Sequence, residues 1–171
     1  MDEPRLPEAA SPTPVCAAFL LKLGRTPDRA KRLRILAACA KVDRPWVEEL
    51  FWEALADPNE TVRDFVVKEL GRRPALRLEL AARRLRRPPW FARSSALGII
   101  GGRRIAAAAP EVVRAAGDDN VEVRRAAAEA LGELGGEEAL RVLVRLKKDP
   151  NPYVRAAAEA AIGKTSSVRF S

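Results

Sequence analysis

The chain has 171 residues, of which 47% are hydrophobic, 32% are charged and 5% are aromatic, and its formal net charge is +8. This length and composition exclude a disordered chain and allow a sizeable core. No run of about 18 uncharged apolar residues occurs, and the N-terminus lacks a basic start followed by an apolar run. The sequence therefore predicts neither a membrane span nor a secretory signal.

Cys16 and Cys39 are the two cysteines, and both fall at apolar helix positions. The pattern predicts buried, reduced thiols in a cytoplasmic protein, with a disulfide as the alternative if the first two helices bring the sulfurs together. Because the chain has no histidine, two cysteines cannot form an ordinary structural zinc site. No metal and no cofactor are expected.

Residues 1–13 are rich in proline and acidic side chains and predict a loose N-terminal leader. From residue 14 onward, apolar residues gather on one side of five evenly spaced segments, which predicts five amphipathic helices. These helices are expected at about residues 14–23, 45–56, 75–86, 105–116 and 137–148.

A second kind of helix is predicted around an arginine that recurs every 30 or 31 residues. The recurring arginines are Arg32, Arg63, Arg93, Arg124 and Arg155. Counted from the arginine, apolar residues stand at positions −1, +3, +4 and +7, which is the spacing of one helical face. Asp-Pro-Asn or Asp-Asp-Asn precedes the arginine in three copies and supplies side chains that cap a helix start.

Glycine stands eight residues after the arginine in four of the five copies. These glycines are Gly71, Gly101, Gly132 and Gly163. Glycine tolerates the left-handed backbone conformation just past a last helical turn, so the arginine helices are expected to end there.

A fixed period of this size is typical of stacked supersecondary units, because neither helix of a pair can bury its apolar face alone. We therefore predict an all-α fold, a right-handed α-solenoid of about five stacked two-helix repeats. Residues 14–163 are expected to form a single domain, and residues 164–171 a C-terminal tail. The arginine helices are expected to form the concave side.

The pattern Asp-x-x-x-x-Val-Arg, followed by Ala-Ala and a closing Leu-Gly, resembles the short HEAT-like repeat named after phycobilisome lyase subunits. The likeness extends from about Ser11 to Gly163 and is strongest at Asp118–Leu134 and Asp149–Gly163. Proteins similar to it are mostly scaffolds and adaptors. Some act in bilin attachment, and one HEAT-like group excises alkylated DNA bases, so the resemblance is specific for fold rather than function.

In proteins with this repeat, the aspartate and the arginine six residues later form a hydrogen-bonded ladder between neighbouring repeats. The resemblance assigns as structural pairs Asp57 with Arg63, Asp118 with Arg124, and Asp149 with Arg155. Thr26 and Arg87 replace the aspartate in the first and third copies. Arg32 and Arg93 therefore lack the usual acid and are expected to be freer to meet a ligand.

A groove on the concave side is the first candidate binding surface. Its candidate residues are Asp64, Lys68, Ser94, Gly98, Arg125 and Glu129. Charges of both signs flank a small, flat centre at Ser94 and Gly98, where the backbone or a helix of a partner could approach closely. The alternative interpretation is that small residues only permit tight curvature.

A basic block is the second candidate surface, since residues 63–104 hold twelve basic and three acidic side chains. The candidate residues of this basic edge are Arg72, Arg73, Arg83, Arg84, Arg86, Arg87, Trp90, Arg103 and Arg104. Arginines beside an aromatic ring could hold phosphates while the ring stacks on a base, or could hold an acidic peptide. Solvated helix ends are the structural alternative. The block indicates an acidic partner, which could be a protein, a nucleic acid or an anionic membrane.

No catalytic constellation is recognisable, because histidine, a glycine-rich phosphate loop and a nucleophile elbow are all missing. Trp90 and Asp64 are the nearest counterparts of the rings and the carboxylate that base-excising relatives need. We therefore predict a non-enzymatic scaffold or adaptor that binds a protein with an acidic surface through the groove or the basic edge. The alternatives are a nucleic-acid-binding module using the block between Arg72 and Arg104 and, more distantly, a HEAT-like DNA glycosylase or a bilin lyase-type enzyme.

Overall fold

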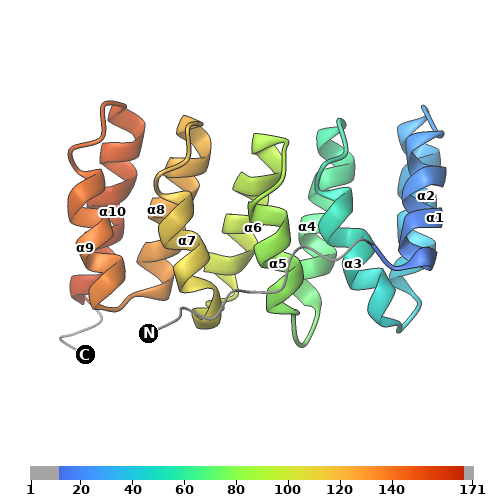
Figure 1. Ribbon diagram of the computed structural model, residues 1–171, viewed down its shortest axis with the longest axis horizontal. Helices are drawn as coiled ribbons and strands as arrows, with labels where there is room; N and C mark the ends of the chain where they lie inside the picture. The colour runs from blue at the N-terminus through green and yellow to red at the C-terminus, as the bar shows by residue number, and fades with distance from the viewer. Residues whose placement is uncertain (1–11, 168–171) are drawn as a thin grey trace. The chain divides into compact units, whose positions relative to one another are not determined.

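The computed structural model describes residues 12–167, and Figure 1 shows that these residues are almost entirely helical. They form ten α-helices and one short 3-10 helix, and no strand occurs among them. The chain divides into two compact units, one ending at Arg83 and the other beginning at Arg84. The expected leader at residues 1–13 lies outside the described residues except for its last two members.

The first unit contains two helix pairs and most of a fifth helix. Its helices are α1 (Pro14–Gly24), α2 (Arg29–Ala40), α3 (Pro45–Ala54), α4 (Glu60–Arg72) and α5 (Leu78–Leu85). Thr13 caps α1 by accepting a hydrogen bond from the backbone N–H of Cys16. Asp28 caps α2 by accepting hydrogen bonds from the backbone N–H groups of Ala30 and Lys31. These side chains satisfy amide groups that a helix start leaves without partners.

The second unit contains the remaining helices. They are α6 (Trp90–Gly102), η1 (Ala106–Ala108), α7 (Ala109–Ala115), α8 (Val121–Leu134), α9 (Glu137–Leu146) and α10 (Pro152–Ser167). Asn120 caps α8 by accepting from two backbone amides, as the Asp-Asp-Asn pattern predicts. Because α10 continues to Ser167, residues 164–167 extend the helix, and the other residues of the expected tail lie outside the described part of the chain.

Most apolar positions of the arginine helices are buried, as their spacing predicts, although Ile35, Val67 and Ile162 are only partly buried. In α4 the buried residues are Val62, Val66 and Leu70, and in α8 they include Val123, Ala127 and Leu131, all with no exposed surface. Within the units, α3 contacts α4, α7 contacts α8 and α9 contacts α10, and α3 contributes the buried side chains of Phe51 and Trp52. The predicted all-α solenoid class is therefore confirmed, with two-helix repeats in each unit.

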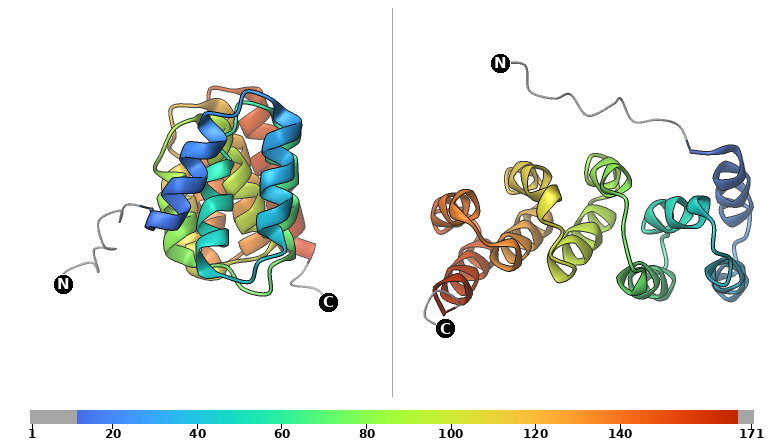
Figure 2. Two further views of the ribbon diagram at one scale, coloured as in Figure 1. Left: turned by 90° about the vertical axis from the view of Figure 1, so that its right-hand side faces the viewer. Right: turned by 90° about the horizontal axis from the view of Figure 1, so that it is seen from below.

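The glycines that follow the recurring arginines do not all end their helices, so that prediction is wrong. Helix α6 continues through Gly101, and α8 continues through Gly132. A Cβ atom at Gly101 would lie 2.8 Å from the Cα of Ala130, and one at Gly132 would lie 2.6 Å from the Cβ of Ala161. Figure 2 shows α6, α8 and α10 side by side, and α8 contacts both α6 and α10. Both glycines thus allow neighbouring helices to approach closely.

We expect Gly101→Ala to destabilise the protein by about 1–3 kcal/mol, because the added methyl group meets the backbone of α8, which cannot move aside cheaply. Gly98→Ala is the matched control on the same helix, since a Cβ there meets nothing within 4 Å. The control should be neutral or stabilising by roughly 0.5–1 kcal/mol through higher helix propensity. Urea denaturation followed by circular dichroism measures both, and equal effects of the two substitutions would contradict the close-packing role.

Candidate binding site

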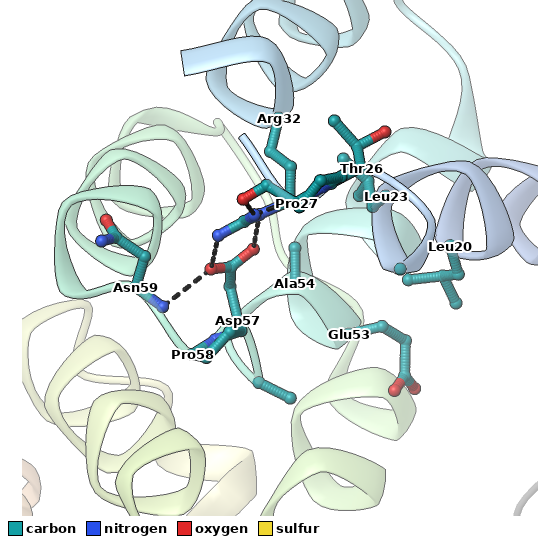
Figure 3. A pocket seen from close by; sticks show the side chains of 12 residues that line it. Leu20, Leu23, Thr26, Pro27, Arg32, Glu53, Ala54, Asp57, Pro58 and Asn59 are labelled. Atoms are coloured by element: carbon teal, nitrogen blue, oxygen red, sulfur yellow. Dashed lines mark hydrogen bonds and ion pairs between the residues drawn. The ribbon is translucent and has the colours of Figure 1, made fainter. Parts of the chain in front are cut away.

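The recurring arginine of the first repeat connects two loops. Its guanidinium Nη1 donates to the carbonyl oxygens of Thr26 and Pro27 at 2.9 and 2.8 Å. Its Nε and Nη2 donate to the two carboxylate oxygens of Asp57 at 2.7 and 3.0 Å. Figure 3 shows this arrangement, in which Asp57 also accepts from the backbone N–H of Asn59 at 2.8 Å. Arg32 therefore joins the loop of its own repeat to the loop of the next one.

The second unit repeats this geometry twice. Arg93 donates to both carboxylate oxygens of Asp118 at 2.9 Å, and Arg124 donates to those of Asp149 at 2.8 and 3.1 Å. The hydrogen bonds from Arg124 hold the pKa of Asp149 below its usual value, although burial of the carboxylate acts in the opposite direction. Two-pronged pairs between guanidinium and carboxylate are among the stronger charge-assisted hydrogen bonds.

The pairing assigned from the family resemblance is wrong in direction. Each aspartate pairs with the arginine 25 residues before it, and not with the arginine six residues after it. The later arginine donates to backbone carbonyls instead. Arg63 donates to the carbonyl of Asp57 at 2.9 Å, and Arg155 donates to that of Asp149 at 2.9 Å. Within one repeat, the arginine side chain binds the backbone carbonyls of its own loop. The aspartate carboxylate of that loop instead binds the arginine of the preceding repeat.

Arg32 and Arg93 are not freer to meet a ligand, which corrects the second expectation drawn from the ladder. Arg32 is only 8% exposed and is held by Asp57, while Arg93 is held by Asp118. The expectation failed because it paired each arginine with the aspartate six residues before it, whereas the acid that holds Arg32 and Arg93 comes 25 residues later.

Most of the basic edge is occupied by contacts within each unit. Arg83 and Arg84 are buried: Arg83 lies 3.1 Å from carboxylate oxygens of Glu49 and Glu53, and Arg84 donates to a backbone carbonyl. Further contacts join Arg72 to Glu69, Arg86 to Glu111 and Arg104 to Glu133, and Arg73 lies over the ring of Phe51. Trp90 is 44% exposed and packs edge-on against Phe91. Arg87 and Arg103 are half-buried.

Acidic side chains from outside the block neutralise much of its charge. Glu49 and Glu53 come from α3, Glu111 from α7 and Glu133 from α8. Counting charges along residues 63–104 cannot detect these partners, because they lie about 25 to 34 residues away in the sequence. The basic edge is also divided between the two units, so the structure does not describe it as one surface.

The predicted groove residues are likewise divided between the units. Asp64 and Lys68 are exposed on α4 of the first unit. In the second unit, Gly98 and Glu129 line a hollow of about 550 Å³ over α6, α8 and α10, whose floor is glycine and alanine apart from Leu97. Ser94 is half-buried and does not line this hollow.

Charged residues around the hollow pair with one another. Arg125 donates to Glu122 at 3.0 Å and also contacts Glu129. Glu133 accepts from Lys164 at 3.1 Å, and this hydrogen bond lowers the pKa of the Glu133 carboxyl. The rim of the hollow is therefore made largely of charges that already have protein partners.

Cysteines and carboxylates are groups among the described residues that could bind a metal ion or act as nucleophiles. Among the described residues, no group of three or more cysteine, aspartate or glutamate side chains could hold a metal ion. Both cysteines are free and buried, and burial raises the pKa of Cys16 to about 12. A thiol with such a pKa is a poor nucleophile at neutral pH. No helix in the described part of the chain is long and apolar enough to cross a membrane.

A basic surface that the sequence analysis missed lies on the first repeat. Residues 22–44 contain eight basic and two acidic side chains. One of the eight is Arg32, which is buried against Asp57. The other seven are exposed: Lys22, Arg25, Arg29, Lys31, Arg34, Lys41 and Arg44. None of these seven forms a salt bridge with any described residue, and we call them the first-repeat basic surface.

Helical spacing explains how α2 presents several of these cations together. Leu36 and Cys39 are buried on the side of α2 that also carries Arg32. Lys31 and Arg34 are three residues apart on the exposed side of α2, and the exposed Lys41 follows directly after the end of the helix, so the three cations form one stripe. Counting the net charge of each repeat separately reveals this surface, because residues 22–44 hold eight basic and two acidic side chains. When these residues are summed with everything outside residues 63–104, acidic residues elsewhere cancel their charge.

Comparison with known proteins identifies the family. A family model described as HEAT repeats matches residues 77–163, which is just over half of the chain, and the chain belongs to the HEAT-repeat family. No curated protein matches the sequence. Among solved structures, human deoxyhypusine hydroxylase in complex with glycerol is similar, with 21% identity and a TM-score of 0.59 over 91% of this chain. The chain spans 64% of the length of that structure.

This structural likeness corrects the predicted function. The expectation of a non-enzymatic scaffold or adaptor relied on the repeat fold, and an enzyme carries the same fold. The repeat therefore does not assign a scaffold role to this chain. At 21% identity the likeness concerns the fold alone, and no activity passes from the hydroxylase to this protein.

We expect Asp149→Asn to destabilise the protein by about 3 kcal/mol at neutral pH, because it leaves the largely buried Arg124 without its charged partner. The folded-state pKa of Asp149 is lowered, so the contribution is fully present above the unfolded-state pKa of about 3.9 and is lost as the pH falls through the folded-state value. The difference in unfolding free energy between the native chain and the variant should therefore shrink below about pH 4.

The matched control for this measurement is Asp119→Asn. Asp119 is exposed, and only its backbone carbonyl accepts a hydrogen bond from Arg124. Its replacement should change the unfolding free energy by less than about 0.5 kcal/mol. A difference between native chain and Asp149→Asn that stays constant from pH 7 to acid would show that the ion pair does not stabilise the fold.

Proposed function

We propose that this protein binds an acidic polypeptide through the first-repeat basic surface. The observation that carries the proposal is a set of seven exposed cations that form no salt bridge with described residues, in a molecule where many other arginines are paired internally. Unpaired cations of one sign attract acidic partners over roughly a Debye length, about 8 Å at physiological ionic strength. The proposal concerns neither the groove nor the basic edge and assigns no scaffold role.

Nucleic acid is less well matched to this surface than a polypeptide. Surfaces that bind single strands combine cations with aromatic rings on which bases stack. The aromatic side chains nearest to the cations, Phe19 and Trp46, stack on each other with ring centroids 4.9 Å apart, so each ring already has one face covered. Acidic side chains need only the cations, which are present on α1, α2 and the loop before α3.

The proposal includes no chemical step at this surface. Its cations are arginines and lysines without a neighbouring histidine or reactive thiol, and the nearest thiol, Cys39, has a pKa raised by burial. We also propose a cytoplasmic location, which the two free, buried thiols support.

Charge reversal tests the proposed binding. The triple variant Lys31→Glu, Arg34→Glu, Lys41→Glu should bind fluorescein-labelled polyglutamate at least about 10-fold more weakly than the native chain, because it replaces attraction by repulsion along the stripe of α2. Fluorescence anisotropy measures the affinity, which for the native chain should also weaken as the salt concentration rises.

A second triple variant controls for net charge. Arg145, Lys147 and Lys148 are exposed cations of the last repeat that form no salt bridge with described residues, and reversing them changes the net charge equally. This variant should keep most of the affinity. An equal loss in both variants, or tighter binding of a single-stranded oligothymidylate than of polyglutamate to the native chain, would overturn the proposal.

A further inference from the structure

A cavity opens beside the first-repeat basic surface, between α1, α2 and α3. Its volume is about 400 Å³. The residues that line it are Phe19, Lys22, Arg34, Ile35, Ala38, Cys39, Val42 and Trp46. All of these residues belong to the first unit, so the cavity is defined within one compact body.

The walls of this cavity are apolar, and two of the unpaired cations stand among them. Phe19 and Trp46 form one wall by stacking nearly parallel, with an angle of 9° between the ring planes. Val42 lies in the loop before α3 and is 40% exposed, which is unusual for a large apolar side chain in this protein. Cys39 is 3% exposed and also lines the cavity. The apolar side chains of this open hollow are partly in contact with water, so an apolar group of a ligand gains by covering them.

The two cations limit what fits the cavity. Lys22 on α1 and Arg34 on α2 line it, and neither forms a salt bridge with a described residue. An uncharged apolar ligand would leave both cations without a salt-bridge partner among the described residues. A chain segment that carries an apolar side chain between carboxylates matches the apolar walls and both cations together.

We propose that this cavity receives one large apolar side chain, such as leucine, from the acidic polypeptide, while carboxylates on either side of it meet Lys22 and Arg34. The inference rests on the proposed function and deepens it, since it gives the partner a motif of an apolar residue flanked by acids. Protein interfaces gain most of their affinity from a few buried residues, and the charges around them favour one orientation of the partner.

Two labelled peptides test the anchor on the native chain. Both consist of glutamates, and they differ only in a central leucine or alanine. Burying the leucine side chain should make the leucine peptide bind about 10- to 100-fold more tightly, as measured by fluorescence anisotropy at physiological salt. The comparison needs no substitution in the protein, so it stays decisive even if a variant fails to fold.

Filling the cavity should remove this preference. Ala38 is exposed and lines the cavity, so Ala38→Phe should bring the two peptide affinities within about 2-fold of each other by occupying the space that the leucine needs. Ala30→Phe is the matched control on the same helix, because Ala30 is exposed and lies outside the cavity. The control should keep the preference for leucine.

The outcomes separate the two proposals. If neither peptide binds, the proposed function fails and the anchor fails with it. If both peptides bind equally well, acidic recognition stands and the anchor is overturned. If the native chain binds vesicles of phosphatidylcholine and phosphatidylserine more tightly than the leucine peptide, and Ala38→Phe weakens that binding, the cavity serves a lipid surface and the polypeptide anchor is overturned.

Discussion

An arginine guanidinium held between two successive loops is the interaction on which the stacking of repeats depends. In Arg32 and Arg124, the same side chain donates to two carbonyls of its own loop and to both carboxylate oxygens of the following aspartate. Taking a guanidinium and a carboxylate out of water is expensive, and only a nearly complete set of hydrogen bonds offsets that cost. The aspartate contributes further by accepting from a backbone amide two residues later, so one pair orders both loops.

Helix spacing adds a second constraint in the second unit. Gly101 and Gly132 leave room for the alanines of the neighbouring helix, so α6, α8 and α10 approach more closely than side chains with a Cβ at these positions would allow. Close approach places small residues on the surface above them, which gives the hollow over these helices its glycine and alanine floor. Close helix packing is therefore enough to explain why small residues line this hollow. The ladder of aspartates is interrupted at Arg87, close to the point where the chain divides into its two units.

The distribution of paired and unpaired charge separates structural from functional cations. Arginines of the central block stabilise the fold through acids such as Glu49 and Glu111, although they dominate the charge of the sequence. The first repeat has fewer cations but leaves seven of them in solvent without acidic partners among the described residues. Charge density along a sequence is therefore a weak guide to a binding surface in a repeat protein, because stacking brings residues about 25 to 30 positions apart into contact. A likeness of fold to a hydroxylase adds no function by the same reasoning, since function depends on the site.

The sequence by itself determined the helix pairs, many of the helix starts and most of the buried positions of the arginine helices, because helical periodicity and capping are local and leave their pattern within a few residues. Val62, Val123 and Asn120 are examples that the structure confirms. Only the tertiary structure decided which arginine pairs with which aspartate, why Gly101 and Gly132 are glycines, and which cations remain unpaired. Each of these depends on the neighbour that stacking places against a residue, and a side chain one repeat away has no local signature in the sequence.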